Sequence, residues 1–168
     1  MAHWEASGQS DEWYTPKLVF DALQCVFDLD VAAPATGPLH VPARAWLSER
    51  SLESRWHGFV WMNPPFGSRN SLAHWLNKFF AYGNGIALTP DRTSAAWFQA
   101  AWPKADAVLF TPKLRFLRPD GSEGKSPSNG ILATPHPHAT PSDDADRLRG
   151  VGCFHDQPST SQVQQDHV

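Results

Sequence analysis

The chain has 168 residues, of which 41% are hydrophobic and 12% aromatic, enough for one domain with a packed core. Its net charge is −3, and residues 1–140 balance 12 basic against 12 acidic side chains, which disfavours a strong non-specific polyanion binder. Cys25 and Cys153 show no metal or disulfide spacing, and there is neither a signal-peptide pattern nor a membrane-length apolar run. We therefore expect a soluble cytoplasmic protein with no membrane partner.

The first elements along the chain are a helix and a short strand. Residues 1–11 are polar, and we expect a flexible N-terminus there. Thr15-Pro16 is a helix-start signal because Thr can cap free N–H groups and Pro fits the first turn. Apolar residues at helical spacing then predict a helix over 16–26. Residues 27–33 indicate a strand that ends in small residues, and 45–56 a short helix or an irregular segment.

Strands and helices alternate in the next part of the chain. The apolar run 59–62 predicts a buried strand, which Asn63-Pro64-Pro65 ends abruptly. The elements expected after it are a helix from Ser71, a strand over 85–88, a helix from Thr93 to about Ala101 and a strand over 106–110. This alternation, with strands that are apolar throughout, predicts an α/β fold whose mostly parallel sheet carries helices on both faces.

A hairpin and a polar tail are expected to close the chain. Residues 114–118 run into a Pro-Asp-Gly turn, and we expect them to pair with 131–133 as a hairpin at the sheet edge. From 134 onward, Pro, His, Gln and Asp dominate, a composition that cannot bury much apolar surface. The prediction is a domain over 12–133 and a disordered tail over 134–168, in which only 151–154 is suited to docking.

The strongest chemical signal is Asn63-Pro64-Pro65-Phe66, directly after the apolar strand. An exocyclic amino group on a nucleobase is a poor nucleophile, so a site that uses one must accept its hydrogens. The Asn63 side-chain oxygen and the Pro64 carbonyl are suitable acceptors, and the prolines stiffen the loop. Phe66 can stack on a base that has left the duplex. The plainer alternative is a turn that only ends the strand.

Two further segments have the character of a cofactor site. Trp13-Tyr14-Thr15-Pro16 opens the first helix, whose free N–H groups suit a carboxylate; simple capping is the alternative. Asp30 stands at a strand end and is followed by small residues up to Ala33, which allow a nucleoside to approach closely. The alternative is that Asp30 only caps a turn, which would give the same sequence pattern.

The chain resembles the phage DNA N-6-adenine methyltransferase family from about Glu12 to about Ala133. The matching elements, in order, are Trp13-Tyr14-Thr15-Pro16, Phe27–Ala33, Val60–Gly67, Pro90-Asp91-Arg92-Thr93 with Trp97-Phe98, and Leu114-Arg115-Phe116 with the turn at 119–121. The resemblance implies a Rossmann-like sheet, S-adenosylmethionine as methyl donor and N6 of adenine in DNA as acceptor. It places Thr15 and Asp30 near the cofactor and 63–66 at the amine, and Trp13, Pro16 and Ala33 are the neighbouring candidates for cofactor contacts. A phage or prophage origin in a bacterial host, and a part in restriction-modification, would follow.

Two positions depart from the family pattern. Phe66 stands where Tyr is commoner, and Arg50-Ser51 interrupts an Asp-Gly-Leu element whose acid would hold the cofactor. Glu49 or Glu53 is the candidate replacement for that acid. One alternative reading is therefore a non-catalytic prophage relative that at most binds nucleic acid. The other keeps the fold but methylates a different amine: cytosine N4, an RNA base or a glutamine side chain.

Basic residues outside these motifs are the candidates for nucleic-acid contacts. Arg92 belongs to the Pro-Asp-Arg-Thr element, while Arg115 and Arg118 lie in a stretch, 111–119, that contains no acid. An ordinary solvated surface is the alternative. His136 and His138 lack Cys or carboxylate partners at ligand spacing, so no metal site is expected.

Overall fold

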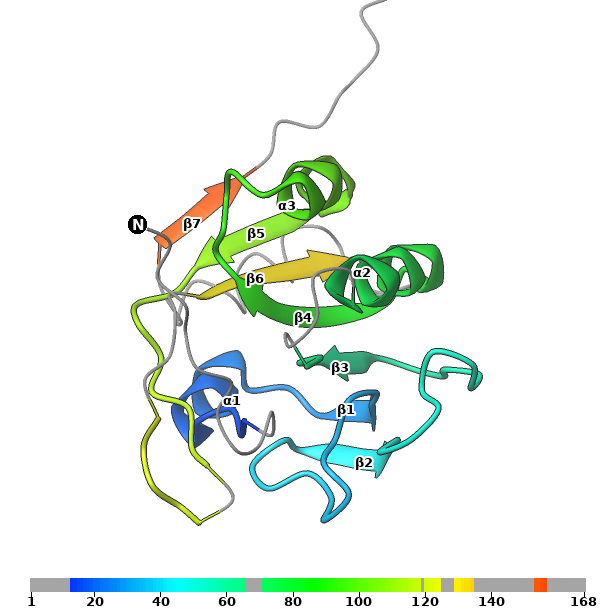
Figure 1. Cartoon of the computed structure of the whole chain (residues 1–168), viewed down its shortest axis with the longest axis vertical. Helices are drawn as coiled ribbons and strands as arrows, with labels where there is room; N and C mark the ends of the chain where they lie inside the picture. The colour runs from blue at the N-terminus through cyan, green and yellow to red at the C-terminus, as the bar shows by residue number, and fades with distance from the viewer. Residues whose placement is uncertain (1–12, 66–70, 119, 125–128, 135–152, 157–168) are drawn as a thin grey trace, which may run out of the picture.

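The computed structural model describes residues 13–65, 71–118, 120–124, 129–134 and 153–156 (Figure 1). The strands are β1 (Phe27–Asp30), β2 (Ala43–Trp46), β3 (Val60–Met62), β4 (Gly85–Pro90), β5 (Ala107–Phe110), β6 (Asn129–Thr134) and β7 (Cys153–Asp156). The helices are α1 (Lys17–Leu23), α2 (Ser71–Tyr82) and α3 (Ala96–Ala101), with a 3-10 turn at Trp102–Lys104.

The strands form one seven-stranded sheet in the order β2-β1-β3-β4-β6-β5-β7. Strands β2, β1, β3 and β4 are parallel, whereas β6 runs antiparallel between β4 and β5, and β7 pairs antiparallel with β5. From β1 the chain moves outward to β2 and then crosses back to β3 and β4. The strand order therefore reverses between β1 and β3, and ligands bind at such switch points in open α/β sheets.

Apolar side chains cover the sheet on both faces. Helix α1 packs on one face against a cluster that includes Trp61 and Leu88. Helices α2 and α3, which lie near each other in Figure 1, cover the other face around Val60 and Met62. All three residues of β3 and all six of β4 are buried, as expected of central strands. The predicted α/β, Rossmann-like class, with parallel strands and helices on both faces, is confirmed.

The segment over 45–56 is neither a helix nor wholly irregular. Strand β2 occupies Ala43–Trp46 and pairs with β1, and a turn over 50–54 follows. The strand was missed because Ala-Arg-Ala-Trp at a sheet edge is only half buried, with exposed Arg44 and Trp46 alternating with Ala43 and Ala45. An edge strand of this kind has little apolar signal.

Helices begin close to both predicted starts, but the expected capping by Thr15 and Thr93 is wrong. Helix α1 spans 17–23 with Pro16 at its N-cap, and α3 starts at Ala96 with Ala95 at its N-cap; neither cap makes a side-chain hydrogen bond. Thr15 is instead buried beneath Asn63, whose amide donates to the Thr15 hydroxyl over 3.2 Å. This threonine therefore serves the site rather than the helix.

The predicted edge hairpin between 114–118 and 131–133 is also wrong. Strand β6 pairs with β4 and β5 inside the sheet. Residues 114–118 make only isolated bridges, from Leu117 to Tyr14 and to Glu123. The turn itself is present: the Gly121 N–H donates to Arg118, and Asp120 accepts from the Ser122 amide and hydroxyl. The two ends of a long turn over 116–124 therefore pair with each other, and Leu117 also pairs with Tyr14 in the N-terminal segment.

Part of the expected tail belongs to the sheet. Cys153–Asp156, which overlaps the segment thought suited to docking, forms β7 on the open side of β5. The expected flexible N-terminus and the segments 135–152, with His136 and His138, and 157–168 lie outside the described residues.

Candidate active site

A cavity of about 300 Å³ opens where the parallel strands end. Its walls come from the loops after β1, β2 and β3, with Trp13 on one side and Trp75 of α2 on another. The lining residues are Trp13, Val31, Ala32, Ala33, Pro34, Ala35, Leu47, Ser48, Glu49, Arg50, Ser51, Asn63, Pro64, Pro65 and Trp75. Its position at the switch point between β1 and β3, and its size, are those of a small-molecule site.

The loop after β1 leaves room for a ligand to lie close to its backbone. It consists of small residues, and its backbone is tied to the loop after β2: the Leu47 N–H donates to the Asp30 carbonyl over 2.8 Å and the Ala33 N–H to the Leu47 carbonyl over 3.1 Å. Ala33 is buried. The two loops are therefore held as one wall of the cavity.

Asn63, in the loop after β3, lines the same cavity and carries an oxygen without a hydrogen-bond partner among the described residues. Its amide nitrogen donates to the Trp13 carbonyl over 3.4 Å and to the Thr15 hydroxyl over 3.2 Å. A carbonyl can only accept, so these contacts fix which end of the amide faces the N-terminal segment. The Asn63 Oδ1 atom is buried and has no hydrogen-bond partner among the described residues. A buried, unsatisfied oxygen costs about 1–3 kcal/mol, so a donor from a ligand would be favoured there.

Asp30 lies at the end of β1 with only 3% of its surface exposed. Burial raises the pKa of its carboxyl to about 7, although the Ala32 N–H, which donates to Oδ1 over 3.1 Å, acts in the opposite direction. The carboxyl borders a second cavity of about 20 Å³, room for roughly one water. Trp13, Ala32, Pro34 and Asn63 line both cavities, so the two are neighbours.

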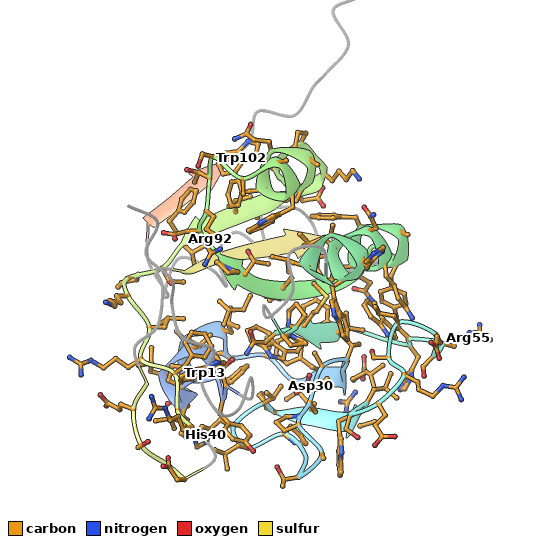
Figure 2. All side chains as sticks on the ribbon, viewed as in Figure 1. Trp13, Asp30, His40, Arg55, Arg92 and Trp102 are labelled. Carbon is orange, nitrogen blue, oxygen red and sulfur yellow. The ribbon has the colours of Figure 1, made fainter. Side chains whose placement is uncertain are left out.

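The sequence-predicted cofactor residues divide between these cavities. Trp13, Ala33 and Glu49 line the large one, while Thr15 and Asp30 line the small one with His40. Figure 2 places Trp13, Asp30 and His40 in the same half of the molecule, around α1, β1 and β2. Pro16 is buried but lines neither cavity.

Arg50 departs from the family pattern, but its charged guanidinium group does not occupy the cavity. Its guanidinium pairs with Glu53 at 2.8 Å, and its side chain is 81% exposed. Its backbone has φ of +49°, a left-handed conformation that favours glycine. Arg50 therefore occupies a backbone conformation that glycine would adopt without strain.

The 116–124 turn covers the N-terminal segment. Leu117 exchanges two backbone hydrogen bonds with Tyr14, at 2.9 and 3.0 Å. Gly124 touches the Trp13 indole so closely that an added Cβ would lie 2.0 Å from the ring, and the Arg118 guanidinium lies 5.7 Å from the ring centroid. The turn is thus joined to Asn63 through Trp13 and Thr15.

The three predicted nucleic-acid contacts are exposed and lie outside both cavities. Arg115 pairs with Glu123 at 2.9 Å, Arg118 lies on Trp13, and Arg92 follows the end of β4. Of the four residues predicted to be catalytic, Asn63, Pro64 and Pro65 line the large cavity, and Phe66 lies outside the described residues.

Sequence reasoning missed several wall residues. Trp75 has core-like helical spacing, yet it faces the cavity and stacks on Trp56 at a centroid distance of 6.4 Å. Leu47 and Ser51, which follow strand β2 in the chain, were missed because that strand was not predicted. Tyr14, whose hydroxyl hydrogen-bonds Thr36 over 2.9 Å, was seen only as part of a motif.

Two absences concern the described part of the chain alone. It contains no group of three or more His, Cys, Asp or Glu side chains placed to bind a metal ion. It also contains no helix with the length and apolar character needed to cross a membrane.

Comparison with known families gives a match over most of the chain. Residues 5–132 match the family described as DNA N-6-adenine-methyltransferase (Dam). Searches of curated proteins and of solved structures each gave no match.

Proposed function

The chain belongs to the DNA N-6-adenine-methyltransferase family, and from that premise we propose that it transfers a methyl group from S-adenosylmethionine to N6 of adenine in DNA. Such a substrate would place the protein in the cytoplasm of a bacterial host. The family match covers the strands and loops that build the cavity, so the proposed activity and the cavity concern the same part of the chain.

The residues of the large cavity fit this cofactor. Aromatic walls at Trp13 and Trp75 suit a nucleoside base, and the small residues around Ala33 leave room beside the backbone. Glu49 provides a carboxylate for ribose hydroxyls. When bound, S-adenosylmethionine supplies a methyl group that its sulfonium centre has already activated.

Asp30 would bind only the ammonium group of the cofactor, which is about the size of the one water that the small cavity can hold, and Thr15 lines the same cavity. Asp30 is the buried carboxyl there, and a cationic ammonium group is the natural partner for its ionised form. Trp13 borders both cavities and would contact the cofactor at their junction. Pro16, which is buried next to Thr15 in the chain, would act by fixing the backbone of that segment.

Asn63 and Pro64 would receive the target amine. The unpaired Asn63 Oδ1 would accept one of its hydrogens and the Pro64 carbonyl the other, which turns the nitrogen lone pair toward the methyl group. Pro65 stiffens the loop, and Phe66 would stack on the flipped base. Catalysis would then consist mainly of positioning.

The DNA backbone would meet the exposed arginines. Arg118 belongs to the turn that covers Trp13, Arg115 precedes that turn, and Arg92 lies in the loop after β4, at the carboxyl end of that strand. Phosphate contacts of this kind orient the duplex without reading its sequence.

The unpaired, oriented oxygen of Asn63 is the observation that carries this proposal. Its test is calorimetric titration of the protein with S-adenosylmethionine, with Asn63→Ala beside it. We expect micromolar binding by the wild type and nearly unchanged binding by the variant, because Asn63 is assigned to the amine. A folded wild type that binds no cofactor at millimolar concentration would rule the proposal out.

A further inference from the structure

Lys78 of α2 is bound to the turn that follows β2. Its ammonium group donates to three backbone carbonyls: Ser51 at 2.7 Å, Leu52 at 2.9 Å and Ser54 at 2.6 Å. An ammonium group has three hydrogens, so the whole donor capacity of Lys78 is used within one turn of chain. No carboxylate is ion-paired with it among the described residues.

Trp56 completes this arrangement from the other side. The Lys78 nitrogen lies 4.5 Å from the centroid of the Trp56 ring, a cation–π distance. The buried Trp56 indole N–H donates to the Ser51 carbonyl over 3.0 Å. The Ser51 carbonyl thus accepts from both side chains, and Trp56 stacks on Trp75, which faces the cavity.

The turn held in this way is one wall of the large cavity. Glu49, Arg50 and Ser51 line it, and the Glu53 and Ser54 amides both donate to the Arg50 carbonyl over 3.0 Å. Arg50 is in a left-handed conformation that its side chain disfavours, so the turn needs support from outside to keep its shape. Lys78 supplies that support from the helix that follows the catalytic loop.

We propose that Lys78 is a positioning residue for cofactor binding: it holds the Glu49–Ser51 wall in the geometry that accepts the nucleoside part of S-adenosylmethionine. This inference rests on the proposed function. It adds a residue that touches neither cofactor nor DNA and that couples α2 to the cofactor wall. Trp56 acts with it.

The test replaces Lys78 by Met, which keeps the length of the side chain and removes its donors. We expect the Kd for S-adenosylmethionine to rise about tenfold, since losing these charge-assisted hydrogen bonds should lower the population of the binding-competent wall by about that factor, and Kd rises in proportion. The kcat at saturating cofactor should stay within about twofold of wild type. Lys104→Met, which removes an exposed charge far along the chain, is the matched control and should bind like wild type.

A second readout needs no cofactor. In the free Lys78→Met protein, hydrogen exchange at the Glu53 and Ser54 amides should be faster than in wild type, while exchange in β3 and β4 stays unchanged. If Lys78→Met does not fold, Trp56→Phe serves instead. It keeps the packed ring but removes the N–H donor to Ser51, and it should raise the Kd in the same direction.

The outcomes separate the two proposals. A wild type that binds no cofactor refutes the proposed function, and the inference falls with it. If wild type binds and Lys78→Met binds equally well, or if kcat falls as much as affinity, the positioning role is overturned while the proposed function stands. A raised Kd for S-adenosylmethionine, an unchanged kcat and faster hydrogen exchange at the turn would together support the positioning role.

Discussion

Replacing Asp30 by Asn should change how the stability of the protein depends on pH. Burial raises the pKa of Asp30 to about 7 in the folded chain, against an ordinary value of 3.8. Between these values the folded state holds a proton that the unfolded state has lost. Stability from this group is therefore fully present below about pH 4 and is lost as pH rises to about 7.

The size of the effect follows from the two pKa values. The difference between 3.8 and about 7 corresponds to at most about 4 kcal/mol of unfolding free energy. Asn is close to Asp in shape and can still accept from the Ala32 N–H, the one contact that holds Oδ1. Asp30→Asn should thus be near wild-type stability at pH 4.5 and more stable by about 2–4 kcal/mol at pH 8.

Urea unfolding of both proteins at several pH values between 4.5 and 8 measures this difference directly. Every other titrating group is common to the pair, so subtraction isolates Asp30. Parallel curves, with a constant difference across the range, would refute the argument that the carboxyl is buried without a charged partner.

Cofactor binding provides a second test of the same group. If Asp30 receives the ammonium group of S-adenosylmethionine, it must ionise, because the charged form is the one an ammonium stabilises. Binding at pH 6 should then release close to one proton, seen as a dependence of the calorimetric heat on the buffer. Asp30→Asn should bind weakly and release none.

Three further substitutions test other parts of the account. Arg50→Gly should raise the unfolding free energy by up to about 1 kcal/mol, because it relieves a left-handed backbone at φ +49°; a lower Tm would contradict this. Gly124→Ala should lower stability by about 1–3 kcal/mol, since its Cβ would meet the Trp13 ring at 2.0 Å, whereas Glu123→Ala should not. Arg118→Ala should weaken DNA binding and reduce the salt slope of log K by about 0.9, and an unchanged slope would remove Arg118 from the interface.

The sequence predicts the central part of this fold well. Strands β3 and β4 are continuous apolar runs, and Leu72, Leu76 and Phe79 fall on one face of α2 at helical spacing. Asn63 was predicted as an acceptor because its amide directly follows a buried strand and precedes two stiffening prolines, and it does line the large cavity. In each case the signal comes from residues that are close together in the chain, so one sequence is enough to predict the feature.

Long-range pairing accounts for what was missed. Nothing local in residues 129–134 says that β6 is inserted between β4 and β5, because antiparallel neighbours are chosen by the whole sheet. Thr15 resembles a helix cap, and only the approach of Asn63 from 48 positions away reveals its role. Lys78 carries no sequence signal, since its three carbonyl partners are backbone groups more than 20 positions distant.

The measurement that tests the central claim most directly is nucleoside analysis of unmethylated DNA incubated with the protein and isotope-labelled S-adenosylmethionine. We expect label in N6-methyldeoxyadenosine with wild type, and at least about 100-fold less with Asn63→Ala, whose cofactor affinity should survive. Label in N4-methyldeoxycytidine would agree with Asn63 and Pro64 as acceptors of an amine but would contradict adenine as the target base. Equal methylation by wild type and Asn63→Ala would contradict the assignment of the site itself.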